Sequence, residues 1–461
     1  MNQIFDIPAD LDTPTSAFLK LAPLKPRFLL ESVEHGERVG RYSFIGFGDG
    51  LDVTSEGGTV TAGDSSTETD GTIRGLMDAL RDALARTPQP GPTSVDVPFH
   101  GGLVGAVGFD AAYRLPGAGS GHTGDGIEMA FYAPPSILAF DHLSRRAALL
   151  HDGAESERQE LRAEVIRLLA GGIPERNGHS GAFDEAQSTM DAAGFVRAVE
   201  SAKSHIAAGD VYQLVLSVGF EGRADVNPFD VYRGLRLLNP SPYMYFMDLN
   251  GMQIIGSSPE ALVRLNGSRA ELRPIAGTRP RSIDPDEDMA AERELLSDAK
   301  EAAEHVMLVD LARNDLGRVA VPGTIKVDPY RSIEKYSHVM HLVSGVAGDL
   351  EPGTDSFDLF AAAFPAGTVV GAPKVRALQL IEAMEPTRRG FYAGTVGYFG
   401  HGGTMDQAIT IRTIVIEGDR YRFQAGAGIV ADSDPESEWQ EVQSKSGAMR
   451  SAIEMACGGL L

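Results

Sequence analysis

Tight turns between strand-like runs are the feature that most constrains the fold of this 461-residue chain. Asn250-Gly251 and Asn266-Gly267 each separate two such runs, and a third turn is expected at 417–419, between the runs 404–415 and 421–430. Asn-Gly readily adopts the left-handed backbone that a two-residue hairpin needs. Long helical patterns accompany these hairpins, above all at 289–312 and 437–456. The mixture predicts an α+β fold, with large antiparallel sheets packed with helices, rather than a wound parallel sheet.

A polar stretch at 171–187, rich in Gly, Pro and Ser, is the best linker in the chain. It separates an N-terminal region, 1–181, from a better patterned region, 188–461, and we expect the two to be intertwined. In the first region a helix is expected at 72–86. In the second, Asp191 is expected to cap a helix that Gly209 ends, and a strand is expected at 211–218.

The composition excludes several classes of protein. Lys and Arg number 41 against 64 Asp and Glu, so the net charge is −23, and no Lys/Arg-rich run offers a nucleic acid a surface. No apolar run reaches the roughly 18 residues that a membrane span needs. The first residues lack the basic and apolar regions of a signal peptide. The single cysteine, Cys457, forms no intrachain disulfide, so we expect a cytoplasmic protein. The charge balance and the lack of a long apolar run predict that it has no nucleic-acid or membrane partner.

Carboxylates on two expected helices form the clearest candidate site. Glu438, Glu441 and Lys445 share one face of the final helix, because their spacing is i, i+3, i+7. Glu304 lies on the face that continues to Leu308, and a carboxylate on an apolar stripe is costly unless it is paired or metal-bound. Carboxylates from separate helices, without clustered Cys or His, suit a hard cation such as Mg²⁺. Spacing alone favours the simpler alternative of a solvated helix face.

Three Gly-containing segments offer further contacts for an anion. The segment 274–281 is a basic turn, 364–374 leads into a helix, and 424–430 carries two glycines that let backbone N–H groups approach a ligand. Each segment alone is most often an ordinary loop. Together they suggest a small, multiply anionic substrate and a divalent ion. The Gly-rich run 101–108 lacks the amphipathic helix that a dinucleotide site requires.

These segments resemble those of the chorismate-utilising enzymes. Matches occur in the same order over about 191–456: 206–213, 257–260, 274–281, 304–318, 364–374 and 425–445. The segments 28–32 and 40–46 resemble the anthranilate synthase large subunit, component I, so the resemblance covers nearly the full length. It implies that family's chorismate-binding fold and an Mg²⁺-dependent lyase of tryptophan biosynthesis. That lyase converts chorismate and ammonia to anthranilate and pyruvate.

The resemblance implies a role for each matching position. Glu260 would be the general acid that protonates the leaving C4 hydroxyl, and His341 would lie beside the ring, with Gln213 and Thr368 completing the catalytic group. Substrate contacts would come from Ala276, Gly277, Thr278, Tyr392, Arg412, Gly426, Gly428 and Lys445. The Mg²⁺ ligands would be Glu304, Glu441 and Glu438.

The nucleophile is indicated by two of these positions. Relatives that use water carry a Lys at the position of Gln213, and a neutral amide cannot take its place as a base. Aminodeoxychorismate synthases commonly carry a nucleophilic Lys at the position of Ala276. With neither Lys present, ammonia is expected as the nucleophile. Cys457 lacks the surroundings of a glutaminase nucleophile, so ammonia would come from a separate glutamine amidotransferase subunit in a hetero-oligomer, or from free solution.

A feedback site for L-tryptophan is also implied by the resemblance. Its residues would be Leu30, Glu31, Ser32, Asn239, Pro240, Ser241, Pro242, Tyr243 and Met244. An ordinary strand and a Pro turn would give the same sequence pattern. Three other functions remain open: an enzyme that stops at aminodeoxyisochorismate, an aminodeoxychorismate synthase, which Ala276 disfavours, and a catalytically silent tryptophan-sensing subunit, which the intact set of site residues disfavours.

Overall fold

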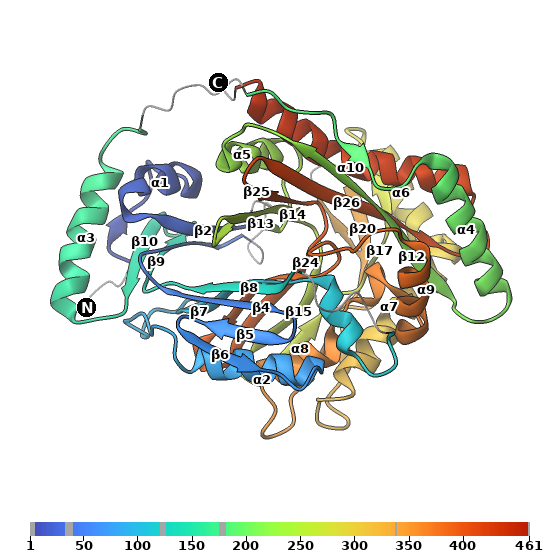
Figure 1. The fold of residues 1–461 in the computed structure, drawn as a ribbon, viewed down its shortest axis with the longest axis horizontal. Coiled ribbons are helices and arrows are strands. Elements are labelled where there is room, and N and C mark those ends of the chain that lie inside the picture. The colour runs from blue at the N-terminus through green and yellow to red at the C-terminus, as the bar shows by residue number, and fades with distance from the viewer. Residues whose placement is uncertain (1–4, 33–39, 120–125, 175–180, 337–338, 460–461) are drawn as a thin grey trace.

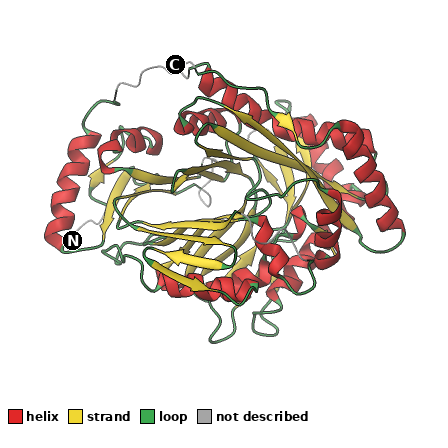
Figure 2. Cartoon of the chain, in the orientation of Figure 1, coloured by secondary structure: helices red, strands yellow, loops and turns green. Residues whose placement is uncertain are grey.

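Two large antiparallel sheets face each other, with helices on their outer sides (Figures 1 and 2). The computed structural model describes residues 5–32, 40–119, 126–174, 181–336 and 339–459. Within these residues the sheets have 12, 11 and 3 strands, and every strand pair runs antiparallel. The predicted α+β class is therefore confirmed.

The first sheet contains strands from both ends of the chain. Its order is β1 (Ile7–Pro8), β10 (Arg146–His151), β9 (Ser136–Asp141), β3 (Tyr42–Phe47), β2 (Pro26–Glu31), β13 (Tyr243–Leu249), β14 (Met252–Ser258), β25 (Thr413–Glu417), β26 (Arg420–Ile429), β12 (Gln213–Arg223) and β11 (Gln187–Ser188), with β22 (Gly371–Ala372) also paired to β12.

The second sheet likewise combines strands from distant parts of the chain. Its order is β18 (Lys326–Val327), β21 (Val346–Asp349), β16 (Arg269–Leu272), β15 (Ala261–Asn266), β24 (Thr404–Ile409), β23 (Thr395–Gly400), β7 (Gly102–Val107), β8 (Ile127–Ala133), β4 (Leu51–Glu56), β5 (Thr59–Ala62) and β6 (Ser65–Glu68). A small sheet consists of β17 (Ile275–Pro280), β20 (Val339–Val343) and β19 (Ser332–Lys335). Because β2 pairs with β13 and β7 with β23, the predicted regions 1–181 and 188–461 both contribute to both large sheets.

The helices cover the outside of this arrangement. They are α1 (Pro14–Lys20), α2 (Ile73–Leu84), α3 (Glu155–Leu169), α4 (Ala192–Ala207), α5 (Pro228–Leu238), α6 (Pro285–Ser297), α7 (Ala299–Leu316), α8 (Ser356–Ala363), α9 (Lys374–Met384) and α10 (Pro435–Cys457), with short 3₁₀ turns η1 (Ala22–Leu24), η2 (Phe109–Arg114), η3 (Gly367–Val369) and η4 (His401–Gly403). Helices α4, α5 and α10 pack on the first sheet, and α2 and α8 on the second, at the opposite side of the molecule (Figure 1). Among the described residues, no helix has the length and apolar character to cross a membrane.

Local sequence signals account for much of this architecture. Asn250 and Gly251 both have positive φ, 56° and 84°, and connect β13 to β14 as predicted. Asp191 caps α4 by accepting a hydrogen bond from the Gly194 N–H at 2.7 Å. The expected helices at 72–86 and 437–456 correspond to α2 and α10.

The run 404–415, predicted as one strand, is two strands in different sheets. β24 belongs to the second sheet and β25 to the first, and the chain crosses between them at 410–412. Arg412 has a φ of 51°, which turns the backbone there. A second crossover, from β14 to β15 at 259–260, runs beside it, since Ile409 N–H donates to Glu260 O at 3.0 Å and Ser257 N–H to Arg412 O at 3.1 Å. The apolar pattern continues through the turn, so periodicity alone did not reveal the break.

Candidate active site

A cavity of about 570 Å³ lies at the two crossovers, between the first sheet, the small sheet and η3. Every residue that the sequence predicted as catalytic or substrate-binding lines it. They are Gln213, Glu260, Ala276, Gly277, Thr278, His341, Thr368, Tyr392, Arg412, Gly426, Gly428 and Lys445, and the predicted metal ligand Glu304 lines it as well. The other two predicted ligands, Glu438 and Glu441, are not in its wall.

Glu260 lies on the crossover from β14 to β15 and lines the cavity. Its backbone is fixed by Ile409, as described above, and by a hydrogen bond from its own N–H to Ser258 Oγ at 3.3 Å. Burial raises the pKa of Glu260 to about 7, although the Thr368 hydroxyl and the Lys445 charge both oppose the rise. A carboxyl group that is still protonated near neutral pH can act as a general acid.

His341 faces the same cavity from β20. A bulge in β17 between Ala276 and Thr278 gives Gly277 a φ of 59° and brings its carbonyl oxygen to 3.1 Å from His341 Nδ1. A Cβ at Gly277 would lie 2.6 Å from Leu295 Cδ1, so the bulge favours glycine. The carbonyl can only accept, which favours a proton on Nδ1, whereas the Thr278 hydroxyl, also 3.1 Å from Nδ1, can donate to the other tautomer. Burial lowers the pKa of His341, with a smaller contribution from the nearby Arg412, and outweighs the hydrogen bond with Gly277, which raises it.

Arg412 provides a positive charge that no protein carboxylate neutralises among the residues described. Its Nη1 donates to Asn239 Oδ1 at 3.0 Å, and burial lowers its pKa. Tyr392 and two glycines of β26 line the cavity too: a Cβ at Gly426 would lie 2.7 Å from the Tyr392 hydroxyl, and one at Gly428 would lie 2.7 Å from Gln213 Nε2. An unpaired guanidinium with open backbone beside it suits a substrate carboxylate.

The predicted metal ligands come from α7 and α10. Gln213 Nε2 donates to Glu304 Oε1 at 3.4 Å, and burial, with smaller contributions from Glu301 and Glu441, raises the pKa of Glu304. Burial also raises the pKa of Glu438, and Glu441 adds to that rise. Glu441 pairs with Lys445 at 2.6 Å.

These carboxylates do not form a closed set of ligands. In the described part of the chain, no three His, Cys, Asp or Glu side chains converge closely enough to hold a metal ion. Glu441 contributes to the raised pKa of both Glu304 and Glu438, so a cation among these carboxylates would relieve their repulsion. An oxygen-only, incomplete set fits Mg²⁺, which keeps waters or takes substrate oxygens in its remaining positions.

The chorismate binding enzyme family model matches residues 25–451. The chain belongs to this family. It is 44% identical over 461 residues to anthranilate synthase component 1 of Thermus thermophilus, covering 98% of this chain and 97% of the relative. The component 1 protein of Streptomyces coelicolor is 43% identical, with 97% and 88% covered. The predicted resemblance is therefore confirmed.

Solved structures agree with the sequence relatives. The crystal structure of anthranilate synthase component I from Streptococcus pneumoniae matches with a TM-score of 0.79 and 34% identity, covering 91% of this chain and 93% of that one. The menaquinone-specific isochorismate synthase MenF of Escherichia coli matches with a TM-score of 0.69 at 22% identity, covering 95% and 91%, and shows a shared fold only.

A second cavity in this chorismate-binding enzyme, of about 450 Å³, lies between the two large sheets. Six residues of the predicted feedback site line it: Leu30, Glu31, Ser32, Pro242, Tyr243 and Met244. The other three, Asn239, Pro240 and Ser241, line the catalytic cavity, because the chain passes from one cavity to the other after α5. The predicted segment is therefore divided between two sites.

The polar side chains of the second cavity differ in how many hydrogen-bond partners they have. The Glu31 carboxylate accepts hydrogen bonds from Arg236, at 3.1 and 3.3 Å, from Tyr232, and from Thr15 at 3.4 Å. In contrast, Ser32 Oγ is buried and has no hydrogen-bond partner among the residues that the structure describes. Ser32 is thus better placed than Glu31 to bind a polar ligand group.

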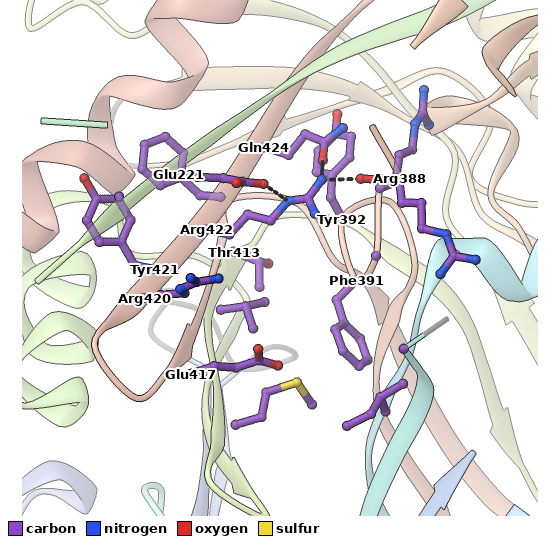
Figure 3. A pocket seen from close by; sticks show the side chains of 18 of the residues that line it. Glu221, Arg388, Phe391, Tyr392, Thr413, Glu417, Arg420, Tyr421, Arg422 and Gln424 are labelled. Atoms are coloured by element: carbon purple, nitrogen blue, oxygen red, sulfur yellow. Dashed lines mark hydrogen bonds and ion pairs between the residues drawn. The ribbon is translucent and has the colours of Figure 1, made fainter. Parts of the chain in front are cut away.

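A third cavity, of about 790 Å³, lies next to the active site (Figure 3). It shares the side chains of Tyr392 and Gln424 with the catalytic cavity. Arg422 crosses it, paired with Glu221 at 3.4 Å and hydrogen-bonded to Gln424 Oε1 at 3.4 Å (Figure 3). Sequence reasoning missed Gln424 as a cavity residue, although it begins the predicted 424–430 segment.

Proposed function

We propose that this chain catalyses the anthranilate synthase reaction, in which chorismate and ammonia give anthranilate and pyruvate. One observation carries the proposal: the cavity combines a buried carboxyl group of near-neutral pKa, Glu260, with the unpaired cation Arg412. A dianionic substrate needs the cation, and a poor leaving group such as hydroxide needs the acid.

Different residues of the site would bind the substrate, hold the metal ion and transfer the proton. Arg412 and Tyr392 would bind the enolpyruvyl carboxylate, and Glu304, Glu441 and Glu438 would hold Mg²⁺, which neutralises the ring carboxylate when bound. Glu260 would transfer its proton to the C4 hydroxyl, so that water leaves. Ammonia would attack C2, and loss of pyruvate would complete the aromatic ring. His341 would lie beside the ring.

The chemistry of Gln213 and Ala276 supports ammonia over water as the nucleophile. Gln213 donates its amide to Glu304 and has no basic nitrogen with which to deprotonate water. Ala276 is a small, buried residue and cannot be a nucleophile. We further propose a cytoplasmic enzyme that receives ammonia from a glutamine amidotransferase subunit and is inhibited by L-tryptophan at the second cavity. The component 1 names of the relatives suggest such a partner.

A product assay tests the proposal. The purified chain is incubated with chorismate, Mg²⁺ and either ammonium or glutamine, and anthranilate and pyruvate are measured separately. We expect both products, in equal amounts, with ammonium only. Accumulation of the amino intermediate without pyruvate would overturn the assignment in favour of an enzyme that stops at aminodeoxyisochorismate. Glutamine-dependent activity of the isolated chain would contradict the need for a partner.

A further inference from the structure

A buried ion pair lies directly behind the catalytic cavity. Glu385, which is 8% exposed, directly follows the end of α9, and Arg389, which is 3% exposed, lies in the loop beyond it. The guanidinium donates two hydrogen bonds to the carboxylate, from Nε to Oε2 at 2.9 Å and from Nη2 to Oε1 at 2.7 Å. Burying two charges costs solvation energy that their attraction does not reliably return. Stability is therefore a weak explanation for this pair.

The remaining donors of Arg389 are directed at the backbone of the active site. Nη1 donates to Val369 O at 2.7 Å, and Nη2 donates to Val215 O at 2.8 Å. Both valines line the catalytic cavity. Val369 follows Thr368 directly, and Val215 is two residues beyond Gln213 on β12. One side chain thus fixes two separate segments that carry site residues.

Two further connections reach side chains in the cavity wall. Glu385 Oε1 accepts hydrogen bonds from the N–H and the hydroxyl of Ser217, both at 2.8 Å, and Ser217 Oγ accepts one from Gln424 Nε2 at 2.8 Å. The Tyr392 ring lies 5.7 Å from the Arg389 guanidinium, which stacks on Phe109 at 4.4 Å on another side. Tyr392 and Gln424 form the wall shared with the third cavity (Figure 3).

We propose that Arg389 is a positioning residue for catalysis, acting through Thr368 and Tyr392 and supported by Glu385 and Ser217. This inference rests on the proposed function. Arg389 touches no reacting atom. Its planar group carries five hydrogen-bond donors and connects three separate segments, through Val215 on β12, Val369 in η3 and Glu385 after α9. The ammonium group of Lys cannot reach all three partners at once. Small displacements of groups that hold the substrate cost rate, because the reacting atoms leave their attack geometry.

The substitution Arg389→Lys tests this role. Lys keeps the charge for Glu385 but cannot serve both carbonyl groups. We expect kcat for anthranilate formation to fall about 10- to 100-fold, while KM for chorismate changes less than about threefold. Arg114→Lys is the matched control. Arg114 pairs with Glu128 at 2.7 Å, and the two side chains are only 5% and 7% exposed, but neither lines the catalytic cavity. It should lower the thermal midpoint and leave kcat unchanged.

A double-mutant cycle separates positioning from general loosening. If Arg389 acts through Thr368, the loss of kcat caused by Thr368→Ala should shrink at least about threefold when Arg389→Lys is already present. The same loss should be unchanged in the Arg114→Lys background. Ser217→Ala removes only the hydroxyl link and should cost kcat about three- to tenfold even if Arg389→Lys does not fold.

Three outcomes would overturn the inference. They are a wild-type kcat in folded Arg389→Lys, a loss of kcat in the double variant that equals the product of the losses in the two single variants, and a wild-type kcat in Ser217→Ala. All measurements use the ammonium-dependent reaction well below the thermal midpoint. A wild-type chain that makes no anthranilate would refute the proposed function instead, so the two failures are distinguishable.

Discussion

At the scale of single residues, the surroundings of Glu260 set its chemistry. A solvent-exposed glutamate is ionised at neutral pH, since its ordinary pKa is about 4.3. The crossover between the sheets shields this one partly from water, and Lys445, the cation that lowers its pKa, already pairs with Glu441. Burial therefore outweighs attraction, and the proton needed for the leaving hydroxyl is retained.

We predict an acid-dependent limb in the pH profile. The raised pKa of Glu260, about 7, means that its protonated fraction falls tenfold per pH unit above that value. At constant free ammonia, kcat/KM should therefore fall above pH 7 in wild type. Glu260→Gln should lower kcat by about 10²- to 10⁴-fold and remove this limb. A profile that stays flat to pH 9 would exclude Glu260 as the acid.

The raised pKa of Glu260 also predicts how folding stability depends on pH. Because its folded-state pKa is above the unfolded value, the proton stabilises the folded form at low pH, and this contribution is lost as pH rises through about 7. Glu260→Gln should thus gain about 1–3 kcal/mol relative to wild type between pH 4.5 and pH 8. Thermal melts at both pH values measure it, with the exposed Glu436→Gln as the control.

Gln213 allows a test of nucleophile choice. A Lys at this position would lie beside Glu304, to which Gln213 now donates. The carboxylate would hold the ammonium protonated, which weakens Lys as a base. We therefore expect Gln213→Lys to give only a trace of isochorismate or salicylate beside anthranilate, measured by chromatography of the products. A folded, active variant that makes anthranilate alone would weaken the role given to this position.

At the scale of elements, two helices from distant parts of the chain supply the acidic groups. α7 carries Glu304, and α10 carries Glu438 and Glu441, so 441 − 304 = 137 residues separate the outermost two. Helical periodicity identifies each face separately, but it contains no information on which faces meet. That meeting follows from the packing of α7 and α10 around the small sheet and β26.

We predict that Mg²⁺ binds between these helices. Mg²⁺ should raise the thermal midpoint of wild type, because it binds only the folded chain and relieves carboxylate repulsion. Glu304→Ala and Glu441→Ala should each abolish both this shift and turnover while the fold persists. Glu436→Ala, on an exposed position of α10, should retain both. Full activity in EDTA would contradict a metal site.

Local elements were more predictable than their connections. Asn250-Gly251 and the Asp191 cap act within a few residues, so the sequence alone indicated the hairpin and the start of the helix. The break at Arg412 was missed, since it interrupts the backbone and not the apolar pattern. Arg389 was missed as well, because an Arg in a loop after a helix usually faces solvent, and only the folded chain reveals that it is buried.

At the scale of the whole molecule, the second cavity lies between the two large sheets, and the catalytic cavity lies where the chain crosses from one sheet to the other. The α+β class and the acidic candidate metal site followed from the residues, whereas the catalytic and substrate-binding roles came only with the family resemblance, because the site joins eight or more separated segments. One short segment connects the two cavities, because Asn239 accepts a hydrogen bond from Arg412 in the catalytic cavity and Tyr243 lines the second cavity. We expect a ligand in the second cavity to act on Arg412 through this segment.

The last prediction concerns L-tryptophan in that second cavity. Its volume, about 450 Å³, is that of a small-molecule site, and Ser32 Oγ is a buried polar atom with no partner in the described part of the chain. We expect tryptophan to inhibit, and chorismate to weaken tryptophan binding by the same factor, because coupling between two sites is reciprocal. Ser32→Phe would fill the space without touching Glu260 or Arg412, so it should abolish tryptophan binding in calorimetry and leave kcat nearly unchanged. Ser65→Phe, on the exposed β6, should stay sensitive. Wild-type sensitivity in Ser32→Phe would place the inhibitor elsewhere.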